Sequence, residues 1–225
     1  MDFVTPGYRP SRLSGVEVWH HAEEAADVVA RLALLVCDVA AAMEVELGCK
    51  PSCTLRLCVY HSNDNAATAL GRNVPPTMLM APRLASDWSL IVCQSPKVDP
   101  RNGDWPQMRR HLAHEVAHVM LADLTGGTRK LGDGGHSLRI RSWFDEGFAE
   151  VAAAVVCARP DIIERYLATP SETAWSEDEL DAALDDIGSP RRPAAFAEAV
   201  RRVQVGYRGR TLRDVVHEME AVARL

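Results

Sequence analysis

Two histidines four residues apart constrain the fold of this chain more than any other feature. His114 and His118 enclose Glu115 and two small apolar residues inside the stretch 105–124, whose apolar positions recur at helical spacing. On an α-helix, such residues are one turn apart and rotated by only about 40°, so both imidazoles leave the same face. The apolar residues that lie roughly opposite are Leu112, Val116 and Val119. The pattern therefore predicts a helix that buries one face and presents two histidines to a cleft.

The same spacing is typical of a zinc site. Two imidazoles one turn apart can bind one tetrahedral ion, and Glu115 flanks their face, where it can reach a metal-bound water without binding the metal. A catalytic zinc ion keeps three protein ligands and an open position. One large class of zinc peptidases has a further histidine six residues after the second one, but that position is Leu124 here, which excludes the class. For the motif alone, two histidines on a solvated helix face remain the alternative.

A second helix, expected over 143–157, carries further carboxylates. It reads Trp-Phe-Asp-Glu-Gly-Phe-Ala-Glu, in which Glu146 and Glu150 are one turn apart. With this helix after its HExxH motif, the chain resembles the gluzincin metallopeptidases, the thermolysin-like and aminopeptidase-like group, which have a Glu in a WLxEGxAE or NEGFA context. The resemblance implies that Glu146 is the third zinc ligand and that Glu150 hydrogen-bonds a ligand histidine. Asp145 is the competing ligand, and a solvated helix charge is the alternative for Glu150.

The resemblance also implies an activity. It is zinc-dependent hydrolysis of peptide or amide bonds, in which Glu115 is the general base for a metal-activated water and the substrate is a peptide or protein. In related folds the edge strand ahead of the HExxH helix pairs with extended substrate, and the stretch 88–93 is our candidate. Two alternatives stay open: a catalytically inactive zinc-binding protein with a structural or partner-binding role, and a helical interaction module in which the motif is accidental.

The group that stabilises the oxyanion is less clearly marked. Gluzincins commonly supply a Tyr or His from their C-terminal helical part, but Phe196 stands where related peptidases often have a Tyr. We assign the role to Tyr207, which precedes a segment similar to a YGxxxL stretch of the family. The alternatives are Tyr166, His217 and His136. His111 is expected to line the cleft or cap a neighbour, not to bind the metal.

The expected fold class is α+β and zincin-like, with a short mixed β-sheet, the active-site HExxH helix and a helical C-terminal part. Period-two alternation predicts strands over 54–60 and 88–93, and helical spacing predicts a long helix over 17–46. The other expected helices span 66–70, 176–187, 193–204 and 211–223. The chain is expected to form one domain, 1–225, made of an α+β half (1–124), a Gly-rich loop (125–142) and a helical part (143–225).

Composition narrows the range of partners. The formal charge of −6 provides no general basic field for nucleic acid. No stretch approaches the roughly 18 to 20 apolar residues of a membrane span, and residues 1–15 lack the apolar core of a signal peptide. We therefore expect no nucleic-acid or membrane partner, and a cytoplasmic location. In that compartment the cysteines are expected to be reduced: Cys49 and Cys53 have no second pair to complete a zinc site, and Cys58 and Cys93 are expected inside strands.

Overall fold

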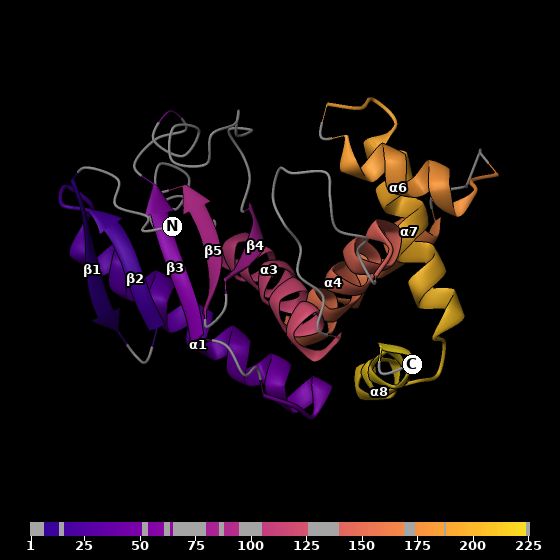
Figure 1. The fold of residues 1–225 in the computed structure, drawn as a ribbon, viewed down its shortest axis with the longest axis horizontal. Coiled ribbons are helices and arrows are strands. Elements are labelled where there is room, and N and C mark those ends of the chain that lie inside the picture. The colour runs from indigo at the N-terminus through magenta and orange to yellow at the C-terminus, as the bar shows by residue number, and fades with distance from the viewer. Residues whose placement is uncertain are drawn as a thin grey trace.

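The computed structural model has an α+β architecture with one mixed sheet and many helices. It describes residues 7–13, 16–50, 54–60, 64, 80–85, 88–94, 105–125, 140–168, 174–186 and 188–223. The strands are β1 (Tyr8–Leu13), β2 (Val16–His21), β3 (Thr54–Tyr60), β4 (Met80–Ala85) and β5 (Trp88–Gln94). The helices are α1 (Ala26–Leu47), α3 (Trp105–Thr125), α4 (Ser142–Val156), α5 (Pro160–Ala168), α6 (Glu177–Asp185), α7 (Arg192–Gly206) and α8 (Leu212–Ala223). Figure 1 shows the sheet and α1 on one side, α4, α6, α7 and α8 on the other, and α3 between them.

The sheet has the strand order β1-β2-β3-β5-β4. The inner pairs β2/β3 and β3/β5 are parallel, and the outer pairs β1/β2 and β5/β4 are antiparallel. The prediction that 88–93 is an edge strand is wrong, because β5 lies between β3 and β4. No strand was predicted at β4, because Pro82 and Arg83 interrupt its apolar pattern. A proline is tolerated at a sheet edge or a bulge, and the register of β4 shifts between Met80 and Arg83.

The long helix predicted over 17–46 begins later in the structure than expected. Residues 17–21 belong to β2, and α1 starts only at Ala26. The residues of β2 are buried at every second position, Val16, Val18 and His20, because one face of the strand is covered while β3 pairs along its side. The predicted end is confirmed: α1 stops at Leu47, and Gly48 takes the left-handed conformation, φ 70°, that glycine adopts most easily.

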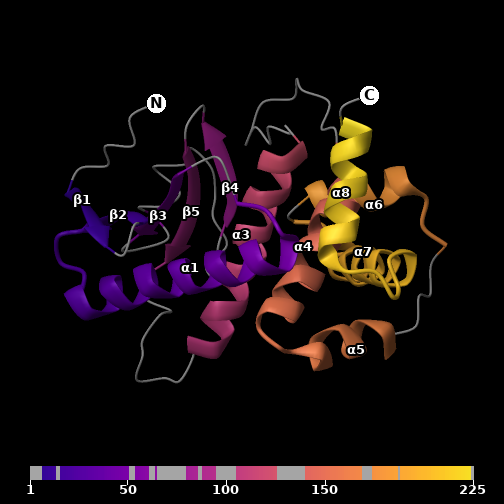
Figure 2. The same cartoon turned by 90° about the horizontal axis from the view of Figure 1, so that it is seen from below.

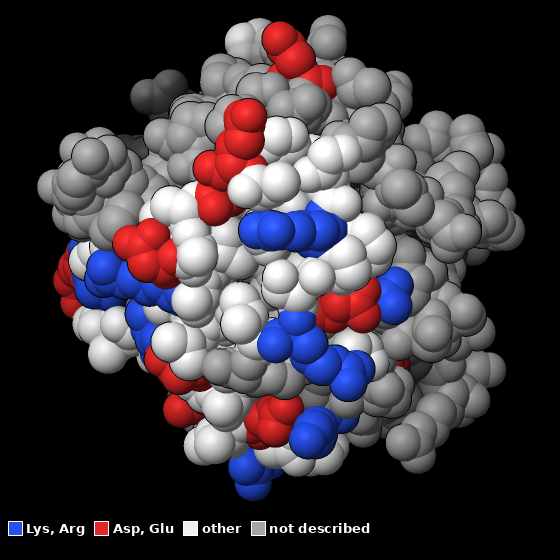
Figure 3. Space-filling model, turned by 90° about the vertical axis from the view of Figure 1, so that its left-hand side faces the viewer, with Lys and Arg blue, Asp and Glu red and all other residues white. Residues whose placement is uncertain are grey.

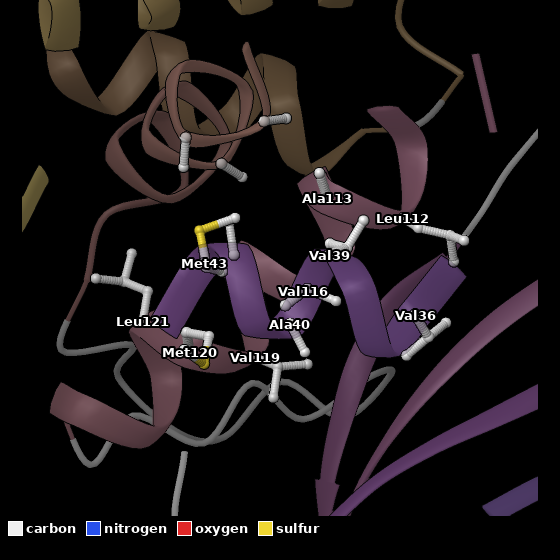
Figure 4. Close-up of a cluster of buried hydrophobic side chains, with 14 of the residues drawn as sticks. Val36, Val39, Ala40, Met43, Leu112, Ala113, Val116, Val119, Met120 and Leu121 are labelled. Carbon is white, nitrogen blue, oxygen red and sulfur yellow. The ribbon is translucent and has the colours of Figure 1, made fainter. Parts of the chain in front are cut away.

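Helix α3 is held by an apolar interface with α1, which crosses it on one side of the sheet (Figure 2). Figure 4 shows the side chains of the two helices meeting. From α1 come Val36, Val39, Ala40 and Met43, and from α3 come Leu112, Ala113, Val116, Val119, Met120 and Leu121. Nearly all of them are completely buried. The predicted apolar face of the HExxH helix is therefore confirmed, and its burial fixes the direction in which the opposite face points.

The C-terminal part is all helical, as expected, but it contains one helix that the sequence analysis missed. No helix was predicted between those over 143–157 and 176–187, whereas Pro160 opens α5. Proline is favoured in a first helical turn because its missing N–H would have no partner there. Ala158, with φ 52°, turns the chain between α4 and α5.

Helices α4 and α7 approach each other at Gly147. A Cβ atom added at this position would lie 2.5 Å from the Ala199 carbonyl oxygen and 2.8 Å from Val203 Cγ2. Only a glycine permits this close approach between α4 and the part of α7 around Ala199 and Val203.

Several predictions concern residues outside the described ranges. They are the short helix over 66–70, most of the Gly-rich loop, His136 and Cys53. Cys58 is buried in β3, as expected. None of the helices in the described part of the chain combines the length and apolar character that a membrane span requires. On the face of the molecule seen in Figure 3, basic and acidic side chains lie among one another without separating by sign.

Candidate metal centre

Three side chains from α3 and α4 converge on one point. The ligand atoms of His114, His118 and Glu146 all lie within 4.8 Å of one another, so this group can hold a metal ion. Glu146 Oε2 is 3.3 Å from His114 Nε2 and 3.7 Å from His118 Nε2, and the two Nε2 atoms are 3.1 Å apart. A tetrahedral zinc ion with bonds of about 2.0–2.1 Å holds its ligand atoms about 3.3 Å from one another. The separations in the structure therefore fit an ion of this size and geometry.

Both histidines are oriented by a carboxylate on the other ring nitrogen. His114 Nδ1 lies 3.2 Å from Glu150 Oε2, and His118 Nδ1 lies 2.6 Å from Asp145 Oδ1. A carboxylate on Nδ1 keeps the proton on that nitrogen and leaves the Nε2 lone pair for a metal. Asp145, the competing ligand in the sequence analysis, thus contacts the nitrogen of His118 that faces away from Glu146. One residue along a helix is a rotation of about 100°, which lets Asp145 and Glu146 reach two sides of one imidazole.

Glu150 is the centre of a buried polar cluster. Its side chain is 2% exposed and accepts hydrogen bonds from Arg110 Nη1 at 3.3 Å and from the Tyr166 hydroxyl at 3.4 Å. Burial alone would raise the pKa of Glu150, but the hydrogen bond to His114 and the charge of Arg110 lower it. The carboxylate is therefore ionised at neutral pH and can hold the His114 N–H. Arg110 and Tyr166 were not assigned to this cluster from the sequence.

The second oxygen of Glu146 contacts α7. Arg192 Nη2 lies 3.5 Å from Glu146 Oε1, and Arg192 Nε donates a hydrogen bond to the Leu184 carbonyl at 3.0 Å. Burial opposes the charge on Glu146, but the hydrogen bonds from both histidines hold its pKa well below the usual value. One oxygen is thus directed at the imidazoles and the other at a guanidinium. No local sequence signal marks Arg192, because it is brought here by the packing of α7 on α4.

The acidic neighbours keep a proton on the histidine pair. Burial alone would lower the pKa of both imidazoles, but hydrogen bonds with Glu146 and Glu150 raise that of His114. The negative charge of Asp145 and its hydrogen bond, followed by the hydrogen bond with Glu146, raise the pKa of His118. The Nε2 separation of 3.1 Å leaves room for one proton between the rings. A cation that binds at this point must displace that proton.

Glu115 lies between the two histidines in the sequence and is buried, with 5% of its surface exposed. The negative charge of Glu115 also raises the pKa of His114, although burial and the hydrogen bonds named above have larger effects. Its carboxylate is therefore close enough to the group to act on it electrostatically. The role of Glu115 as a base stays a prediction.

The other residues singled out in the sequence lie in different places. The Tyr207 ring packs against Phe144 at 5.8 Å, and its role as oxyanion stabiliser stays a prediction. The Phe196 ring is 6.1 Å from that of His114, so α7 does face the centre at this position. His111 accepts a hydrogen bond from Gln107 at 2.9 Å and is not part of the converging group. His217 is exposed on α8.

Comparison with known proteins adds no relative to this geometry: no protein family matches the chain, and no curated protein matches it.

Proposed function

We propose that this chain is a zinc metallopeptidase of gluzincin type, with a zincin-like fold and a peptide or protein substrate. The observation that carries the proposal is the double orientation of the histidines: each Nδ1 is held by its own carboxylate while both Nε2 atoms face Glu146 Oε2. Two imidazoles and one carboxylate with an open fourth position are the ligand set of catalytic zinc in several peptidases. A structural zinc site is normally closed by a fourth protein ligand.

A zinc ion bound here would make a water nucleophilic near neutral pH and polarise a substrate carbonyl. Glu115 takes the proton from the attacking water and passes it to the leaving amine. Asp145 and Glu150 hold the Nδ1 protons, so that the imidazoles keep the tautomer that binds a metal. Arg192 contacts Glu146 Oε1, which would leave Glu146 Oε2 to hold a metal ion.

A catalytically inactive zinc-binding protein remains the second candidate. The observation that favours it is Phe196, which lies beside His114 but has no hydroxyl to donate to an oxyanion. The centre would then bind zinc equally well but would not hydrolyse a peptide.

Metal content and peptidase activity separate these candidates. We expect one zinc ion per chain in the purified protein, measured by mass spectrometry, and its loss in His118→Ala. We expect Glu115→Gln to retain the zinc ion and to lose hydrolysis of a mixed peptide library by a factor of at least about 10². Hydrolysis that survives Glu115→Gln with zinc bound would refute the mechanism. Full zinc occupancy without hydrolysis in the wild type would favour the inactive protein, and zinc that persists in His118→Ala would refute the site.

A further inference from the structure

A pocket lined by arginines lies on the Glu150 side of His114. It has a volume of about 290 Å³ and is formed by the first turns of α3, the turn before α5 and α5 itself. Its lining residues are Gln107, Arg110, Arg159, Ile162, Arg165 and Tyr166. This volume is far larger than the roughly 30 Å³ share of one water in the liquid, and it is close to the lower limit of about 300 Å³ for ligand pockets. The pocket has room for a small molecule.

The lining is rich in groups that can donate hydrogen bonds to an anion. Three of the six lining side chains are guanidinium groups, and the Tyr166 hydroxyl adds another donor. Burial and the charge of Glu150 raise the pKa of Tyr166 to about 12, so this hydroxyl keeps its proton. Planar guanidinium groups bind phosphate and carboxylate through paired hydrogen bonds.

The arginines of the pocket contact carboxylates at its edge. Arg159 is paired with Asp161 through two contacts of 2.8 Å, and Arg165 also approaches Asp161, at 3.7 Å. Arg110 is paired with Glu150. An anion entering the pocket would be within reach of guanidinium N–H donors, of which each arginine carries five.

We propose that this pocket binds a small anionic molecule through a phosphate or carboxylate group, and that its occupancy is coupled to the metal centre. The coupling runs through Arg110, which lines the pocket and also contacts Glu150 Oε1, while Glu150 Oε2 holds His114 Nδ1. The coupling rests on the metal centre proposed above, whereas the anion site itself does not.

The sign of the coupling depends on Glu150, whose carboxylate interacts with both Arg110 and His114. An anion that draws Arg110 toward the pocket leaves more of the negative charge of Glu150 to the His114 N–H. A stronger bond at Nδ1 makes Nε2 a better metal ligand, and the anion itself attracts the metal charge. Anion and metal therefore strengthen each other's binding, and by linkage the factor is the same in both directions. We expect about a fivefold effect, at the lower end of such couplings.

The test measures anion binding without reference to hydrolysis. Inorganic phosphate and succinate are titrated into metal-free protein by isothermal calorimetry, and the comparison of the two probes distinguishes a phosphate from a carboxylate ligand. We expect saturable binding of at least one probe, weakened about tenfold by Arg165→Ala, because one charge-assisted hydrogen bond is lost. The matched control is Arg208→Ala, which removes an exposed arginine outside the pocket and is expected to leave the affinity unchanged.

The coupling is measured by repeating the titration with zinc-loaded protein. We expect about fivefold tighter binding of the anion than in metal-free protein, and a ratio near one in Glu150→Gln. Binding directly to the metal is recognised because Arg165→Ala would leave it intact. Absence of saturable binding, or equal weakening in Arg165→Ala and Arg208→Ala, overturns the anion site. Equal affinities with and without zinc in the wild type overturn the coupling alone, and neither result depends on peptidase activity.

Discussion

The close approach of α4 and α7 makes Gly147→Ala an informative substitution. In an exposed helix interior, replacement of glycine by alanine stabilises a protein by about 0.8–1 kcal/mol, because the backbone loses less entropy. At position 147 the added Cβ would stand 2.5 Å from the Ala199 carbonyl oxygen, and 2.8 Å from Val203 Cγ2. Val203 can rotate, but Ala199 contributes a backbone atom inside α7. The two helices must therefore move apart.

The expected magnitude follows from two opposed effects. Overpacking of a core costs about 1–3 kcal/mol, and a clash with helix backbone belongs at the upper end of that range. Subtracting the helix gain of about 1 kcal/mol gives a net destabilisation of about 2 kcal/mol. For a chain of 225 residues this corresponds to a lowering of Tm by about 4–8 °C.

The assay is urea and thermal unfolding in the presence of a chelator, so that metal binding does not contribute. Gly206→Ala is the matched control, because it lies at the end of α7 and an added Cβ there meets no atom within 4 Å. We expect the control to equal or slightly exceed the wild type in stability. A Gly147→Ala protein as stable as Gly206→Ala would refute the packing argument. Because Gly147 follows Glu146, we also expect weaker zinc binding in Gly147→Ala.

Three further predictions test the metal centre and the core. Asp145→Asn should weaken zinc binding by a factor of about 10–100 without changing the circular dichroism spectrum; an unchanged affinity in a chelator competition would contradict the orienting role. The pKa of His114 and that of His118 are raised in the folded state. Their contribution to the stability of the metal-free protein is therefore fully present below the unfolded pKa of about 6.5. It is lost as the pH rises through the folded pKa values. Zinc affinity should accordingly rise with pH, and zinc binding near pH 8 should release protons, as calorimetry in buffers of different ionisation enthalpy can measure; no proton release would contradict it. Leu32→Ala, at a position that is 0% exposed, should cost about 2–5 kcal/mol. Leu34→Ala on the same helix, at 52% exposure, should stay within about 0.5 kcal/mol in urea unfolding, and equal losses would contradict the burial of α1.

Regular apolar spacing was a good guide to most helices and to the strands β3 and β5, whose predicted bounds are confirmed, but not to the other three strands. The helices α3, α4, α7 and α8 lie within a few residues of their predicted bounds, because each has enough turns to reveal a periodic apolar face. Strand β2 was merged into α1, since six residues are too few to separate the two periods. Strand β4 carries Pro82, and its place at the edge of the sheet depends on pairing with β5, which no local pattern records.

The sequence spacing alone places His114 beside His118, and Glu146 beside Glu150, on one face of a helix. Residues four apart on a helix share a face whatever surrounds it, so the sequence alone determined which side chains can act together. Only the tertiary structure decided which further residues contact these side chains. Asp145 contacts His118, and Arg192 contacts Glu146. Arg110 and Tyr166 both donate hydrogen bonds to Glu150. These contacts depend on the distance and rotation between α3, α4, α5 and α7. Helix packing sets both quantities through buried apolar side chains and the glycine at 147, and these lie far apart in the chain.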